Sequence, residues 1–190
     1  DIDILISSNK PQNIMDVFTT LADVKETIAK GPTKSSALTK DNIQVDVRVV
    51  DESSYGASLM YFTGSKEHNI KLRQLAIKHG LKLNEYGIFK AEKRIAGKTE
   101  EEMYKTLGLS YIEPELREDR GEFEASLKSA LPNLVKVEDI KGDLHMHSTW
   151  SDGGNSMEEM VIKSMELGYE YIAITDHSQG LKIAGGLNTH

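Results

Sequence analysis

The residues best suited to chemistry form two clusters near the end of the chain. Residues 143–152 read Asp-Leu-His-Met-His-Ser-Thr-Trp-Ser-Asp, and a second acid–histidine pair follows at Asp176 and His177. Successive side chains of a strand point to opposite faces, so His145 and His147 project the same way, with room for one ion between them. Imidazole suits Zn²⁺, Mn²⁺ or iron, and added carboxylates favour harder ions. The pattern predicts a metal site, although two histidines on one strand face can also be packed or solvated.

Acidic residues at the start of the chain suggest a second, oxygen-only metal site. Asp1 and Asp3 fall on one face of a predicted strand, and Asp46 shares the polar face of a later strand with Arg48. Converging carboxylates are costly unless cations neutralise them, and oxygen ligands favour Mg²⁺ or Mn²⁺. Two such ions roughly 4 Å apart can support phosphoryl transfer. The simpler interpretation, an exposed strand with acidic residues, is open at this point.

Composition narrows the class of protein. The 190 residues include no cysteine, so disulfides and thiolate metal sites are impossible, and a cytoplasmic protein is weakly favoured. No apolar run reaches the roughly 18 residues of a membrane span. The net charge of −7 hides a basic block, residues 66–98, with nine basic and three acidic residues, followed by an acidic block, residues 99–143, with twelve acidic and six basic residues. The basic block could contact phosphates, or it could be a solvated surface.

Hydrophobic periodicity predicts how these residues are positioned. Strands over residues 1–7, 24–30, 34–40 and 43–50, with a helix containing Ile14 and Phe18, predict a small mixed sheet with a helix packed on one side. Two helices, a hairpin and a third helix are expected next, at 54–60, 66–79, 81–84 with 88–91, and 99–108.

The chain then changes character. Residues 113–141 read as an acidic, proline-bounded linker with one helix at 121–130. A strand, a helix and a strand at 143–147, 156–167 and 169–175 predict a parallel unit, which places the polar residues at the carboxyl ends of its strands.

Several short segments together resemble the palm and thumb of family X DNA polymerases, the group that includes DNA polymerase beta. They are Asp1-Ile2-Asp3, Val45-Asp46-Val47-Arg48, Tyr61-Phe62-Thr63-Gly64-Ser65, Asn69 and Arg73, and the resemblance runs from Asp1 to about Glu118. From His145 onward the chain resembles the PHP (polymerase and histidinol phosphatase) domain, which bacterial family X members carry after the thumb.

The resemblance implies a role for each matching residue of the polymerase part. Asp1, Asp3 and Asp46 match the family's metal-binding carboxylates, with Asp46 acting on the primer 3′-hydroxyl, and Arg48 matches an arginine that interacts with the first two acids. The other matches are the segment lining the sugar of the incoming nucleotide (Tyr61, Phe62 and Gly64), the reader of the incoming base (Asn69) and a residue that reaches the template strand (Arg73). Where the family has an aspartate after Gly-Ser, this chain has Lys66, so that nucleotide contact does not carry over.

In the PHP part, four residues match ligands of a trinuclear metal site that would hold Mn²⁺ or Zn²⁺: His145, His147, Asp152 and His177. Asp176 would serve beside them. The resemblance also implies a Mn²⁺-dependent 3′-5′ exonuclease activity.

The fold class expected from this resemblance is an α+β nucleotidyltransferase-like palm with a small α/β thumb, then the first β-α-β unit of a PHP (β/α) barrel. The chain looks truncated at both ends. The expected domains are a partial palm, the thumb, a linker and the N-terminal part of a PHP domain, at 1–53, 54–112, 113–141 and 142–190.

The expected function is that of a fragment of a DNA-directed DNA polymerase acting in DNA repair, by two-metal nucleotidyl transfer to a primer 3′-hydroxyl. The exonuclease would belong to the parent protein, and the fragment itself should be weak or inactive. The expected partners are gapped or primer-template DNA and deoxynucleoside triphosphates, bound by a monomer. The alternatives are a stand-alone PHP-type metallophosphoesterase and a non-catalytic DNA-binding fragment.

Overall fold

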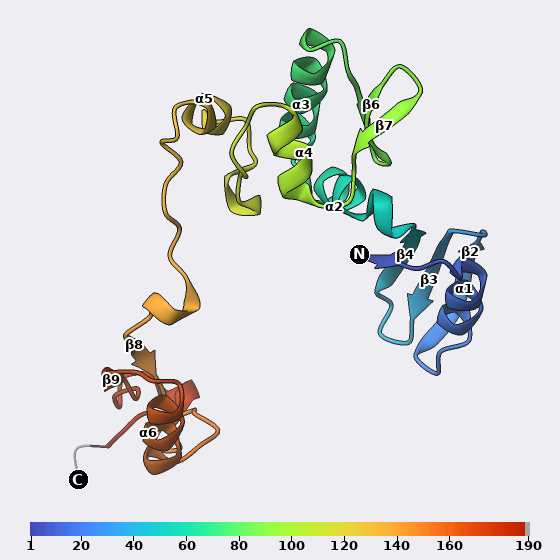
Figure 1. The fold of residues 1–190 in the computed structure, drawn as a ribbon. Coiled ribbons are helices and arrows are strands. Elements are labelled where there is room, and N and C mark those ends of the chain that lie inside the picture. The colour runs from blue at the N-terminus through green and yellow to red at the C-terminus, as the bar shows by residue number, and fades with distance from the viewer. Residues whose placement is uncertain (189–190) are drawn as a thin grey trace. The chain divides into compact units, whose positions relative to one another are not determined.

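A computed structural model describes residues 1–188 of the chain. It contains two compact units, Asp1–Leu131 and a second unit that begins at Pro132 (Figure 1). Residues 189–190, the end of the predicted PHP part, lie outside the described residues. Within residues 1–188, no helix combines the length and the apolar character needed to cross a membrane.

The first unit opens with a four-stranded sheet in the order β1-β4-β3-β2. β1 runs parallel to β4, and the other neighbours are antiparallel. Helix α1 packs on one face, where Met15 and Phe18 meet Val45, Val47 and Val49. The bounds are Ile2–Ser7 for β1, Pro11–Thr19 for α1, Val24–Lys30 for β2, Lys34–Thr39 for β3 and Gln44–Val50 for β4. The predicted mixed sheet with one covering helix is confirmed.

The rest of the first unit surrounds a second core, with Leu72, Met103 and Ile112 at its centre. A Cβ on Gly56 would lie 2.3 Å from backbone atoms of Thr99, so glycine lets α2 approach the start of α4 closely. The elements are η1 (Glu52–Ser54), α2 (Tyr55–Thr63), α3 (Lys66–Lys78), β5 (Lys82–Asn84), β6 (Gly87–Lys90), β7 (Lys93–Ala96), α4 (Glu100–Thr106), η2 (Pro114–Leu116) and α5 (Glu122–Leu127).

Three features of this region differ from the sequence prediction. Residues 61–63, expected between two helices, form the last turn of α2, which ends at Gly64 with φ of 77°. Strand β7 was not predicted, because its charged residues hide the alternation. Residues 113–131, expected to be linker, belong to the first unit, since Phe123 of α5 is buried in the second core.

The second unit contains a parallel pair of strands, β8 (Gly142–Met146) and β9 (Tyr171–Ile174), connected through α6 (Met157–Glu166). Ser156 and Glu159 form the predicted capping box at the start of α6. Two short 3₁₀ turns flank this arrangement, η3 (Val137–Asp139) and η4 (Lys182–Ala184). The predicted strand-helix-strand unit is confirmed.

Candidate polymerase and metal sites

Two of the predicted carboxylates lie at paired positions on neighbouring strands. Asp3 of β1 is in register with Asp46 of β4, and both line a cavity of about 350 Å³ together with Arg48. The strand alternation explains this, because Val45, Val47 and Val49 are buried against α1 and the residues between them must face the opposite side. The predicted common face of Asp46 and Arg48 is confirmed.

Asp46 is held as a carboxylate by its neighbours. Gln44 Nε2 donates a hydrogen bond to Oδ1 at 2.9 Å, and Lys34 Nζ lies 3.0 Å from Oδ2. Hydrogen bonds from Gln44, Lys34 and Ser36 lower the pKa of Asp46 to about 2. Sequence reasoning missed Lys34, and the available signal was its place opposite Arg48 in the β3–β4 register.

Asp1 is placed differently. It is exposed and precedes β1, and it is not among the residues that line the cavity of Asp3 and Asp46. Asp1, Asp3 and Asp46 do not form a group with ligand atoms all within 4.8 Å of one another. The oxygen donors of Asp3 and Asp46 suit Mg²⁺ or Mn²⁺, whereas a ligand role for Asp1 stays a prediction.

The five predicted nucleotide-contacting residues of the thumb line one larger cavity of about 590 Å³ beside α3: Tyr61, Phe62, Gly64, Asn69 and Arg73. Lys66 lines it as well. Asn69 is 7% exposed; its Nδ2 donates to the Tyr61 carbonyl oxygen at 2.8 Å, while its buried Oδ1 has no hydrogen-bond partner.

Aromatic rings organise the cations around these cavities. The Arg73 guanidinium lies 5.3 Å from the centroid of the Tyr61 ring, and that of Arg48 lies 4.7 Å from the centroid of the Phe62 ring. The two rings meet edge to face at 4.9 Å. Because Phe62 lines both cavities, the last turn of α2 connects the carboxylate site to the face of α3.

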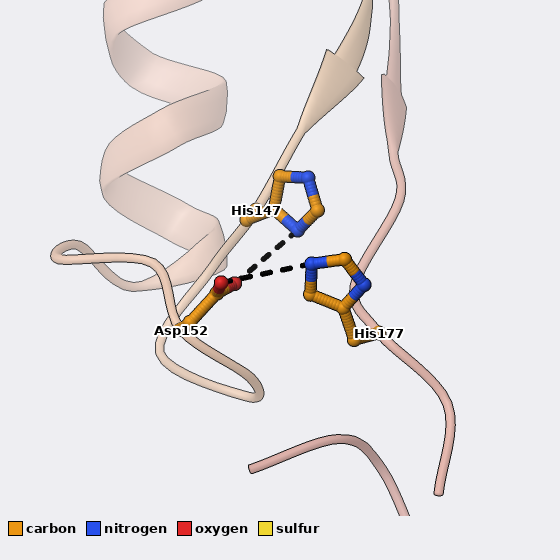
Figure 2. Close-up of side chains that lie close together, drawn as sticks. All are labelled: His147, Asp152 and His177. Atoms are coloured by element: carbon orange, nitrogen blue, oxygen red, sulfur yellow. Dashed lines mark ion pairs between the residues drawn. The ribbon is translucent and has the colours of Figure 1, made fainter. Parts of the chain in front are cut away.

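The second unit brings together three of the four predicted PHP ligands, as Figure 2 shows. Ligand atoms of His147, Asp152 and His177 all lie within 4.8 Å of one another. Asp152 is 3.4 Å from His147 Nδ1 and 3.6 Å from His177 Nε2. The buried His147 Nδ1 has no hydrogen-bond partner. Two imidazoles and one carboxylate, with one nitrogen unsatisfied, fit Mn²⁺ or Zn²⁺.

His145 lies outside this group, although its ring centroid is only 5.1 Å from that of His147. It is exposed, while Met146 between them is buried. The two histidines therefore project to the same side of the strand as predicted, and a ligand role for His145 stays a prediction.

Asp176 supports the turn that carries Asp152. Its carboxylate accepts hydrogen bonds from the Ser148 backbone N–H at 2.7 Å and from the Ser148 and Ser151 hydroxyls, both at 2.6 Å. These hydroxyl bonds hold the pKa of Asp176 below its ordinary value. Gly153 completes the turn, since a Cβ there would lie 2.2 Å from the His147 carbonyl oxygen. Sequence reasoning did not single out the two serines, although they lie within the ligand motif.

Comparisons with known proteins match both parts. The sequence model of the DNA polymerase beta thumb matches residues 58–118, and that of the PHP domain matches residues 143–184. The DNA polymerase/3′-5′ exonuclease PolX of Bacillus subtilis is 42% identical over 98% of this chain and 33% of its own length. The chain thus spans about a third of that relative.

More distant relatives match the polymerase part alone. DNA polymerase IV of Saccharomyces cerevisiae is 39% identical over 33% of this chain and 11% of its own length. DNA polymerase lambda of Rattus norvegicus is 33% identical over 40% of this chain and 15% of its own length.

A solved structure supports the fold. The crystal structure of Leishmania infantum polymerase beta, a ternary gap complex, superposes with a TM-score of 0.50 and 23% identity, covering 61% of this chain and 55% of that one. The polymerase beta-like fold of the front part, the thumb match and the PHP match occur in the predicted order. The chain belongs to the family X DNA polymerases and carries a DNA polymerase beta thumb followed by the start of a PHP domain.

Proposed function

We propose that the chain provides palm carboxylates and the thumb of a DNA polymerase that acts in DNA repair, extending a primer 3′-hydroxyl at a gap. The observation that carries this proposal is the register of Asp3 with Asp46 beside a cavity that also contains Arg48. Its substrates would be gapped or primer-template DNA and deoxynucleoside triphosphates.

The carboxylate site is suited to phosphoryl transfer. Asp46, with its pKa lowered to about 2, is ionised at neutral pH and can accept either a cation or the proton of a primer hydroxyl. Two divalent ions bound at Asp3 and Asp46 would stabilise the attacking and leaving oxygens. Because Lys34 already pairs with Asp46, binding of a divalent ion there exchanges one cationic partner for another.

The thumb cavity is suited to a nascent base pair. Asn69 and Arg73 are four residues apart on α3 and so share one helix face, and both line the cavity. The unpaired Asn69 Oδ1 can accept a hydrogen bond from a bound nucleotide. The Tyr61 ring and backbone, held by Arg73 and Asn69, would limit the space beside its sugar.

A second activity, metal-dependent phosphoester hydrolysis, is favoured by His147, Asp152 and His177. Their two nitrogens and one oxygen would hold Mn²⁺ or Zn²⁺, which lowers the pKa of a bound water. We propose that this site serves a 3′-5′ exonuclease. The same three residues would serve a stand-alone metallophosphoesterase, which would not need the thumb cavity.

DNA binding is the first test, because it requires no turnover. We expect the chain to bind a fluorescently labelled duplex with a one-nucleotide gap more tightly than an intact duplex, as measured by anisotropy. Equal affinity for the two DNAs would contradict the polymerase proposal.

The two proposed activities can be separated by substitution. On the gapped duplex with Mn²⁺, we expect weak extension, since the chain spans about a third of its PolX relative. Asp46→Ala should remove extension and leave 3′-end removal intact, and His147→Ala should do the reverse. The two-site proposal fails if either variant loses both activities while circular dichroism shows that it is folded.

A further inference from the structure

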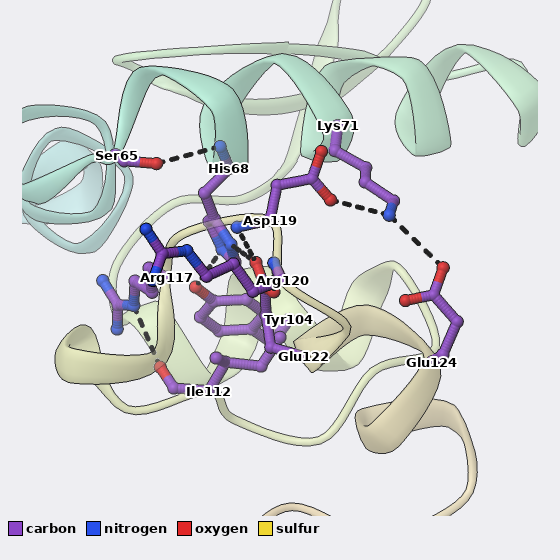
Figure 3. A network of polar contacts seen from close by, with 10 residues as sticks. All are labelled: Ser65, His68, Lys71, Tyr104, Ile112, Arg117, Asp119, Arg120, Glu122 and Glu124. Carbon is purple, nitrogen blue, oxygen red and sulfur yellow. Dashed lines mark hydrogen bonds and ion pairs between the residues drawn. The ribbon is translucent and has the colours of Figure 1, made fainter.

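A buried polar network fastens the start of α3 to the segment that follows the thumb, as Figure 3 shows. His68 is fully buried and Glu122 is 6% exposed. His68 Nδ1 lies 2.7 Å from Glu122 Oε1, and His68 Nε2 lies 2.9 Å from the Tyr104 hydroxyl. Phe123 stacks on the imidazole at a centroid distance of 4.6 Å.

The protonation states give this network a single direction. Burial lowers the pKa of His68 in spite of Glu122, so its ring is neutral, and burial raises the pKa of Tyr104, so its hydroxyl keeps its proton. The Tyr104 hydroxyl therefore donates to His68 Nε2, and His68 Nδ1–H donates to the Glu122 carboxylate. This order selects one imidazole tautomer.

Glu122 is itself fixed by the chain around it. Its carboxylate accepts hydrogen bonds from the backbone N–H groups of Asp119 at 2.8 Å and Arg120 at 2.7 Å. Although burial raises the pKa of Glu122, hydrogen bonds from His68 and the backbone lower it by more, so the group is ionised. A buried carboxylate with three donors is a rigid anchor, because losing it leaves those donors unsatisfied.

Helix α3 presents two different faces to its surroundings. Ser65, His68 and Lys71, spaced three residues apart, contact the segment 117–124: the Ser65 N–H donates to the Arg117 carbonyl oxygen at 2.9 Å, and Lys71 Nζ lies 2.7 Å from Asp119. Asn69 and Arg73, at a different angle around the helix axis, line the thumb cavity instead. The anchored face and the cavity face are thus built from adjacent residues of one helical turn.

We propose that Glu122 is a positioning residue for the thumb cavity: through His68 it fixes the first turn of α3 and thereby the side chain of Asn69. Glu122 lies 54 residues from His68 along the chain and beyond residue 118, where the thumb match ends. The segment after the thumb is therefore part of the apparatus that holds the nascent base pair. This inference rests on the proposed function for its effect on DNA, but not for its effect on Asn69.

The direct test observes Asn69 without DNA. The Asn69 side-chain NH₂, which donates to Tyr61, is followed by NMR through its chemical shift and hydrogen exchange, and its signal is identified with Asn69→Asp. In Glu122→Gln we expect the signal to shift and exchange to accelerate. The matched control is Glu124→Gln, which removes an exposed carboxylate on the same helix that contacts Lys71 at 3.3 Å. An Asn69 signal that is the same in the wild type and in Glu122→Gln would overturn the proposal.

A double-mutant cycle tests whether Glu122 acts through Asn69. We expect Glu122→Gln to weaken binding of the gapped duplex, with Mg²⁺ and the complementary nucleotide, by about tenfold, and to have no further effect in an Asn69→Ala background. Equal weakening in both backgrounds would mean a purely structural role and would overturn the proposal. If Glu122→Gln fails to fold, Glu122→Asp, which keeps the charge but shortens its reach, replaces it in both experiments. A wild-type chain that binds no DNA would refute the proposed function and leave the NMR experiment to decide the positioning role.

Discussion

Asp176 offers a test of the histidine site that does not alter a proposed ligand. Its three hydrogen bonds to Ser148 and Ser151 fix the turn between His147 and Asp152. In Asp176→Ala these bonds are lost, and Asp152 is no longer held near the two imidazoles. Partners that orient metal ligands typically contribute about 10–100-fold to metal affinity, or about 1.4–2.8 kcal/mol, and we expect a loss in this range.

Mn²⁺ titration calorimetry near neutral pH measures this effect. The pKa of Asp176 is lowered, so its stabilising contribution is present above the ordinary aspartate pKa and is lost only as the pH falls through the lowered value. The control is Glu166→Gln, which removes an exposed carboxylate of the same unit paired with Lys163, and His147→Ala provides the loss of a ligand. If Asp176→Ala bound Mn²⁺ as tightly as the wild type while His147→Ala did not, the positioning argument would be refuted. Absence of wild-type binding would refute the metal site itself.

Three further predictions concern the first unit. Arg117→Met should lower the free energy of unfolding in urea by about 3–5 kcal/mol, because it leaves Glu100, 2.6 Å from Arg117 Nη1, buried without its charge partner; a loss below about 1 kcal/mol would contradict this. Lys66→Ala should weaken gapped-duplex binding and reduce the slope of log Kd against log salt concentration by about 1, whereas Lys78→Ala, on the same helix but outside the cavity, should change neither. In Asp46→Asn, the loss of unfolding free energy between about pH 4 and pH 2 should be smaller than in the wild type by about 2 kcal/mol, since the carboxylate has a pKa of about 2 when folded; equal acid sensitivity would show that Asp46 is not held as described.

The predictions that succeeded depended on local signals. Alternation in β4 places Val45, Val47 and Val49 on the buried face and therefore Asp46 on the other. The capping box at Ser156 sets the start of α6 within one residue. Such patterns are readable because strand and helix periods act over a few neighbouring residues.

The features that sequence reasoning missed depend on long-range contacts. His68 lies between Glu67 and Asn69 in a charged stretch, and only α4 and α5 make it a buried residue. Strand β7 carries Arg94, whose Nη1 donates to the Ser54 hydroxyl at 2.6 Å, 40 residues away. Residues 113–131 have a linker-like composition, but Phe123 supplies enough apolar surface to join the core. Composition thus misjudged a segment whose attachment depends on a few buried side chains.

The structure also changes the interpretation of the basic block. Several of its cations are neutralised within the first unit: Lys71, Arg94 and Lys98 all pair with carboxylates. Lys66 and Arg73 both line the thumb cavity, and neither pairs with a carboxylate of residues 1–188 at ion-pair distance. Positive charge available to a phosphate is therefore concentrated where α3 faces the cavity, and a chain with net charge −7 can still attract DNA at that face. Because few cations contribute, the salt dependence of binding should be modest and should trace to individual residues of α3.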